Sequence, residues 1–217
     1  MKKIIVFAAT TLLASAAISR DAMYSWYEGL SPKSVLYAVN CGSEDPVVDV
    51  NGIEYKPDRG YSGGQSSLDG YQLKKWIVPN TEVYYSERWS DANFNYKIPI
   101  NTKEDTTVTL ILKFSEVYFK AEGEKQFDVK IGDTYVARDL DPLKLSFGKY
   151  SPYDLFVELS IRSGKIFIDG KEAKNAVKGS DLVVDFIKGR ADNPKINAIL
   201  LVQGSSKNTH QASFQKF

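Results

Sequence analysis

Residues 107–114 read TVTLILKF. Every second position of this stretch carries a large apolar side chain, a period that favours a β-strand. The side chains that would share the buried face are those of Val108, Leu110, Leu112 and Phe114. Thr107, Thr109 and Lys113 lie between them and would face solvent. The stretch therefore predicts a core strand with one apolar and one polar face.

The same two-residue period continues on both sides of this strand. The expected strands cover residues 35–40, 107–114, 127–131, 134–137, 155–161, 166–168, 182–188 and 196–202. Gly132-Asp133 and Ser163-Gly164 offer the two-residue turns that close hairpins, and the last two strands form a further pair. After the first residues no stretch keeps the apolar spacing of a long helix, so any helices would be short and peripheral. The expected fold class is all-β, an antiparallel β-sandwich.

The N-terminus has the composition of a secretory signal peptide. Met1-Lys2-Lys3 is basic, residues 4–17 are apolar, and Ala14-Ser15-Ala16 supplies the small residues of a cleavage site. We expect a signal peptide at residues 1–17 and cleavage after Ala16 or Ala17. An uncleaved membrane anchor is the alternative, although the run is shorter than the roughly 20 residues that span a bilayer.

Two flanking segments complete the expected organisation. Residues 18–33 form a charged and aromatic lead-in with room for one short helical turn, and residues 205–217 form a polar tail. Residues 34–204 would be one domain, a size that can bury a substantial core. No later segment is apolar enough to span a membrane, so the mature chain is expected to have no membrane span.

Charge and residue counts exclude several function classes. The 28 basic residues balance 27 acidic ones, which argues against nucleic acid as a partner. The single histidine, His210, lies in the polar tail and leaves no catalytic triad or zinc cluster in the folded body. Cys41 has no internal partner and is expected to be a buried apolar group, with pairing to another chain as the alternative. No metal or cofactor is expected.

One enzyme class needs only two carboxylates and survives this elimination. A glycosidase places an acid and a base on either side of a sugar linkage. The formal candidates are Glu87, Glu116, Asp128 and Asp192. Carboxylates at strand edges and in loops more often make structural hydrogen bonds, so catalysis is the remote alternative.

Aromatic residues next to polar loops indicate a binding surface. Tyr118 and Phe119 are adjacent where the regular strand ends, so the two rings cannot both point into the core. Trp89 lies in a polar segment, and residues 51–71 form a long Gly-, Ser- and Tyr-rich stretch typical of a binding loop. Rings of this kind pack on the C–H face of a sugar, whose hydroxyls Asp192 and Asn193 could bond.

The chain resembles the malectin domain over residues 34–204. The stretches that carry the resemblance are YAVNCG at 37–42, VDVNGI at 48–53, SERW at 86–89, FNYKIPI at 94–100, LKFSEVYF at 112–119, FDVKI at 127–131, FIKG at 186–189 and DNPK at 192–195. The resemblance implies a jelly-roll-like β-sandwich of the lectin or carbohydrate-binding-module type. It implies a lectin of the endoplasmic reticulum that binds glucosylated high-mannose N-glycans and catalyses no reaction.

The resemblance also implies which residues contact the sugar. Tyr118 and Phe119 are similar to the family's stacking pair, and Asp192 is similar to its hydroxyl-accepting carboxylate. Trp89 stands where the family's Thr-Glu-Arg-Tyr motif has tyrosine, and Tyr71 is similar to the tyrosine of its Asp-Tyr-Gly motif, with the order changed. These five residues are the expected carbohydrate-binding site.

Localisation and partners follow from the same resemblance. The expected partner is a glucose-containing oligosaccharide or N-glycan, with glycoproteins or a membrane-bound protein as further candidates. The chain ends in Phe217 without a Lys-Asp-Glu-Leu signal, so either the lumen of the endoplasmic reticulum or secretion is expected. A module that binds proteins or cell-wall glycans is the alternative function.

Overall fold

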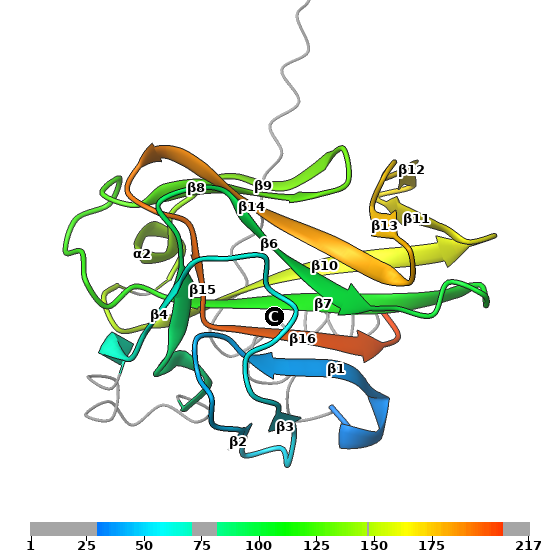
Figure 1. Cartoon of the computed structure of the whole chain (residues 1–217), viewed down its shortest axis with the longest axis horizontal. Coiled ribbons are helices and arrows are strands. Elements are labelled where there is room, and N and C mark those ends of the chain that lie inside the picture. The colour runs from blue at the N-terminus through cyan, green and yellow to red at the C-terminus, as the bar shows by residue number, and fades with distance from the viewer. Residues whose placement is uncertain (1–29, 71–81, 147, 206–217) are drawn as a thin grey trace, which may run out of the picture.

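The computed structural model describes residues 30–70, 82–146 and 148–205 (Figure 1). The expected signal peptide and most of the expected polar tail lie outside these ranges. The lead-in is described from Leu30 onward, and it contains one short turn of 3-10 helix, η1 (Pro32–Ser34). Within the described ranges, no helix combines the length and the apolar character needed to cross a bilayer.

Strands account for most of the regular structure. They are β1 (Val35–Asn40), β2 (Val47–Val48), β3 (Glu54–Tyr55), β4 (Gln65–Ser67), β5 (Glu87–Trp89), β6 (Phe94–Pro99), β7 (Thr106–Ser115), β8 (Gln126–Ile131), β9 (Thr134–Leu140), β10 (Pro152–Arg162), β11 (Lys165–Ile168), β12 (Lys171–Glu172), β13 (Val177–Lys178), β14 (Asp181–Ala191), β15 (Lys195–Ile196) and β16 (Ala198–Gln203). The other described helices are η3 (Glu82–Tyr84) and α2 (Pro142–Leu145), both short as expected.

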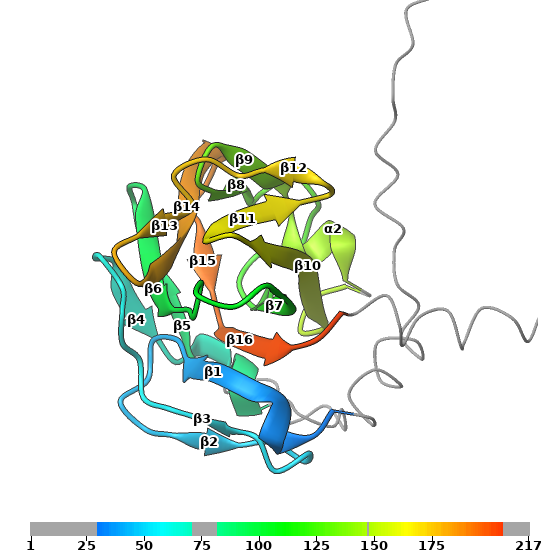
Figure 2. The same ribbon diagram turned by 90° about the vertical axis from the view of Figure 1, so that its right-hand side faces the viewer.

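Two large sheets form the body of the molecule. The six-stranded sheet has the order β1-β16-β7-β10-β11-β12, and the five-stranded sheet has the order β13-β14-β8-β9 with β6 also paired to β14. The ladders between these strands are antiparallel. Figure 2 shows the two sheets facing each other. The all-β antiparallel sandwich predicted from the sequence is confirmed.

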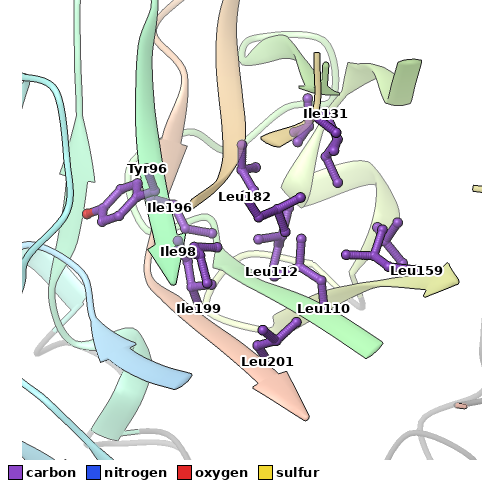
Figure 3. Close-up of a cluster of buried hydrophobic side chains, with 14 of the residues drawn as sticks. Tyr96, Ile98, Leu110, Leu112, Ile131, Leu159, Leu182, Ile196, Ile199 and Leu201 are labelled. Atoms are coloured by element: carbon purple, nitrogen blue, oxygen red, sulfur yellow. The ribbon is translucent and has the colours of Figure 1, made fainter. Parts of the chain in front are cut away.

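The main core fills the space between these two sheets. Leu110, Leu112 and Leu201 reach it from the six-stranded sheet, while Ile131 and Leu182 reach it from the five-stranded sheet (Figure 3). The four side chains predicted for the inner face of residues 107–114 all belong to this cluster. Period-two patterning therefore placed the core face of β7 correctly.

The other face of β7 departs from the prediction. Thr109 and Lys113 were expected to face solvent, but both are buried, and only 2% of Lys113 is exposed. A second apolar cluster covers this side of the six-stranded sheet, because the β2–β3 hairpin and η3 fold over it with Tyr55 and Val83. A pattern read along one strand cannot show what a distant segment will cover.

A charged network satisfies the buried lysine. Lys113 Nζ lies 2.9 Å from Asp154 Oδ2, and the hydroxyl of Tyr84 donates to Asp154 Oδ1 over 2.7 Å. A buried ammonium is tolerated only when such partners replace its water. Lys113 on β7 and Asp154 on β10 are neighbours in the sheet register, which brings the charges together.

Two other expectations need correction. The last two expected strands do not pair, because β14 lies in the five-stranded sheet and β16 in the six-stranded sheet. Residues 51–71 are not wholly irregular, since β3 and β4 lie within them. The turns expected at Gly132-Asp133 and Ser163-Gly164 do close the hairpins β8–β9 and β10–β11.

Cys41 is a free, fully buried thiol, as expected. Burial raises its pKa well above the ordinary value, and the negative charge of Asp58 raises it further. Because alkylation requires the thiolate and access to it, native Cys41 is expected to resist iodoacetamide at pH 8 and to react fully in guanidinium chloride. Mass spectrometry of the labelled chain checks this, and full labelling of the folded protein within minutes would contradict it.

Candidate functional site

An exposed aromatic pair follows the end of β7. Tyr118 is 74% exposed, and Phe119 beside it is also accessible to solvent. The centroids of the two rings lie 5.0 Å apart with an interplanar angle of 84°. This edge-to-face contact is a favourable one, so the rings support each other and present apolar surface at the rim of the sandwich.

A buried carboxylate holds the backbone of this pair. Glu116 is 1% exposed, and its Oε1 accepts hydrogen bonds from the amides of Tyr118 and Phe119 over 2.7 and 2.9 Å. Lys149 Nζ donates to the carbonyl of Tyr118 over 3.0 Å. Glu116 therefore fixes the turn that carries the two rings.

Asp192 and Phe119 contact the same lysine, Lys125. Asp192 follows β14 in a left-handed conformation, φ 54°, which Asp adopts more readily than most residues. Its Oδ2 pairs with the ammonium of Lys125, which also donates to the carbonyl of Asn193 over 3.1 Å. The same ammonium lies 5.4 Å from the ring centroid of Phe119. Three of the predicted residues, Tyr118, Phe119 and Asp192, therefore lie in one region. The two members of the ion pair, Lys125 and Asp192, are 67 positions apart in the chain.

Trp89 belongs to the small sheet β15-β5-β4 at the same end of the molecule. It lies directly between Lys195 of β15 and Gln65 of β4 in the register, so these three side chains share one sheet face. The ammonium of Lys195 pairs with Glu87 and also donates to the carbonyl of Ser115, the last residue of β7. In Figure 1 this sheet lies opposite the β11–β12 end. Lys195, the register neighbour of Trp89, thus links this small sheet to the end of β7, the strand that the aromatic pair follows.

The opposite face of β5 is held by a buried carboxylate. Asp58 accepts hydrogen bonds from the Gly42 amide over 2.7 Å, from Arg88 Nε over 2.7 Å and from the Tyr96 hydroxyl over 2.8 Å. The guanidinium carbon of Arg88 also lies 3.4 Å from the ring centroid of Tyr61. These contacts fasten β5, and with it Trp89, to the body of the sandwich.

Two glycines permit the close approach of chain segments to β5. Gly42 has φ +78°, and a side chain there would meet the carbonyl oxygen of Glu87 at 2.0 Å. Gly64 has φ +86°, and a side chain would meet the carbonyl of Trp89 at 2.5 Å. Both positions combine a left-handed backbone with backbone contact, which only glycine accommodates without strain.

Other aromatic residues near Trp89 in the sequence lie elsewhere. Tyr84 is buried in the second apolar cluster and Tyr85 packs against it, so neither ring contributes to the exposed rim. Tyr71, the fifth expected contact, lies outside the described residues.

Three residues of this region were not expected from the sequence. Lys125 pairs with Asp192 and Lys195 pairs with Glu87. Gln65 is exposed beside Trp89. No local pattern marks a lysine as buried, because its partner is distant in the chain. The only available signal was the length of residues 51–71, which suggested a binding loop and contains Gln65.

A family profile described as the Malectin domain matches residues 35–199, most of the chain. The chain belongs to the malectin family. Mouse Malectin is 35% identical over 178 residues, which cover 80% of this chain and 58% of that protein. Malectin-A of Xenopus laevis is 37% identical over 182 residues, covering 82% and 63%. The chain thus spans about three fifths of the length of these malectins.

Solved structures share the fold of the malectin family at lower identity. The extracellular domain of ANXUR1 from Arabidopsis thaliana has a TM-score of 0.57 at 20% identity, over 77% of this chain and 42% of that one. Beta-glucuronidase 2 of Bacteroides uniformis has a TM-score of 0.53 at 14% identity, over 82% and 18%. At these identities the likeness concerns the fold alone.

Proposed function

We propose that this chain is a non-catalytic lectin that binds glucose-containing oligosaccharides. The observation that carries the proposal is an exposed aromatic pair, Tyr118 and Phe119, beside the lysine-held carboxylate of Asp192 in a chain of the malectin family. Trp89 would extend the surface, and Tyr71 is proposed as a further contact.

The chemistry of these groups suits a sugar. The C–H face of a pyranose packs on an aromatic ring, and a carboxylate accepts hydrogen bonds from hydroxyls. Asp192 uses Oδ2 for Lys125, and its side chain remains 29% exposed. A hydroxyl of a sugar stacked on the pair could therefore donate to the remaining oxygen.

Membership of the malectin family supports a finer proposal. The ligand would be a glucosylated high-mannose N-glycan, met in the lumen of the endoplasmic reticulum or after secretion. Residues 34–204 would form the binding domain, after removal of a signal peptide at residues 1–17. A glycoprotein that carries such a glycan would be the partner.

The carboxylates considered for a glycosidase support the non-catalytic assignment. Glu116 holds two backbone amides, and Asp128 Oδ1 accepts a hydrogen bond from the amide of Asp139 over 2.8 Å. Glu87 and Asp192 each pair with a buried lysine. A glycosidase instead needs two carboxyl groups that are free to act on either side of a sugar linkage.

A glycan array probed with the purified chain tests the proposal. We expect signal for glucosylated N-glycans and for oligomers of α-linked glucose, and none for the same glycans without glucose. Absence of any glucose-dependent signal would contradict the sugar specificity. Capture of a protein that excess free oligosaccharide does not displace would favour a protein-binding module instead.

A further inference from the structure

Lys125 is a buried cation at the centre of the candidate site. It directly precedes β8 and is only 6% exposed. Burying an ammonium is unfavourable unless partners replace its water. The groups around Lys125 must therefore stabilise its ammonium, and the same contacts fix the positions of those groups.

Its partners come from two loops. The carboxylate of Asp192 and the carbonyl of Asn193 belong to the loop between β14 and β15. The ring of Phe119, 5.4 Å away, belongs to the loop after β7 and lies within the distance of a cation–π contact. One ammonium thus contacts both halves of the proposed sugar surface.

We propose that Lys125 is a positioning residue for this site. It sets the carboxylate of Asp192 and the ring of Phe119 relative to each other, without touching the sugar itself. Its effect on affinity rests on the proposed function, whereas its effect on the two side chains does not. A sugar that stacks on one loop and bonds to the other requires both at a fixed separation, because small displacements weaken simultaneous contacts.

The loop offers a matched control. Lys188 donates from Nζ to Oδ1 of Asn193 over 2.7 Å, and its side chain is exposed. The substitution Lys188→Met removes an ammonium that bonds the same loop through Asn193. A general effect of losing a lysine near the site would therefore appear in both variants.

Calorimetry with an α-linked glucose disaccharide measures the effect on affinity. Loss of a charge-assisted contact predicts that Lys125→Met binds about 10-fold more weakly. Lys125→Arg, which keeps the cation, should bind within about threefold of the parent chain, and Lys188→Met within about twofold. In an Asp192→Asn background, Lys125→Met should add less than about twofold, because the two residues act together.

Nuclear magnetic resonance of the free proteins measures positioning without a ligand. We expect Lys125→Met to shift the ring-proton signals of Phe119 and the side-chain carboxyl carbon of Asp192, and Lys188→Met to leave both unchanged. Unchanged signals in Lys125→Met would overturn the proposal, as would equal losses of affinity in Lys125→Met and Lys125→Arg. If the parent chain binds no sugar, the proposed function and the affinity effect fall, and the resonance shifts alone decide the positioning role.

Discussion

Replacing both Tyr118 and Phe119 by alanine is expected to weaken binding of glucose oligosaccharides by about 100-fold or more. Truncating an aromatic anchor of an interface costs about 2 kcal/mol or more, the costs of two residues in contact add only in part, and every 1.4 kcal/mol is a tenfold change in the dissociation constant. The variant removes both stacking surfaces and leaves Asp192 and its lysine in place. Calorimetric titration of the parent chain and the variant gives the ratio directly.

The fold should survive this double substitution. Tyr118 is largely exposed, and neither ring belongs to the two apolar clusters. Tyr135→Ala is a suitable control, since Tyr135 is another exposed tyrosine, stacked under Arg138 at 3.4 Å on β9. We expect that control to bind normally. Retention of parent-like affinity by the double variant, with its melting temperature unchanged, would remove the aromatic pair from the site.

Asp58→Ala is expected to lower the free energy of unfolding by about 3–5 kcal/mol, the usual cost of removing one partner from a buried ion pair. The substitution leaves the guanidinium of Arg88, the amide of Gly42 and the hydroxyl of Tyr96 without their shared acceptor. Guanidinium denaturation followed by circular dichroism measures the change. Sugar affinity should also fall, because β5 carries Trp89.

A surface carboxylate provides the comparison for that effect. Asp105 is exposed and accepts one hydrogen bond, from the amide of Ser163 over 2.7 Å. Asp105→Ala should cost about 1 kcal/mol, the value of one ordinary hydrogen bond. Equal costs for Asp58→Ala and Asp105→Ala would show that the buried network around Arg88 contributes little to stability.

The strands were predictable because each carries its own period. The inner face of β7 and the turns of two hairpins depend on residues close together in the chain, so local patterns identify them. The burial of Lys113 depends on segments far from it, the β2–β3 hairpin and η3. When distant segments cover the second face of a sheet, the sequence of the strand itself does not show it. The prediction of a solvated face was wrong for that reason.

The candidate site was likewise only partly predictable from the sequence. Tyr118, Phe119, Asp192 and Trp89 were named from motifs that resemble those of malectins. In the structure Phe119 and Asp192 contact one lysine, and Tyr118 packs against Phe119. The role of that lysine could not be read from the sequence, because Lys125 looks like any charged residue before a strand. Its role depends on the contact with Asp192, which forms only in the folded chain.

The burial of β7 on both faces affects which parts of the protein unfold locally. Structure that is packed on both faces opens only with the whole protein, whereas loops at a rim open locally at small cost. Tyr118 lies three residues beyond the end of β7 and is tied back to it through Glu116. The stacking rings are therefore attached to the segment whose amide protons should exchange most slowly with solvent, so thermal breathing of the rim would leave them in place.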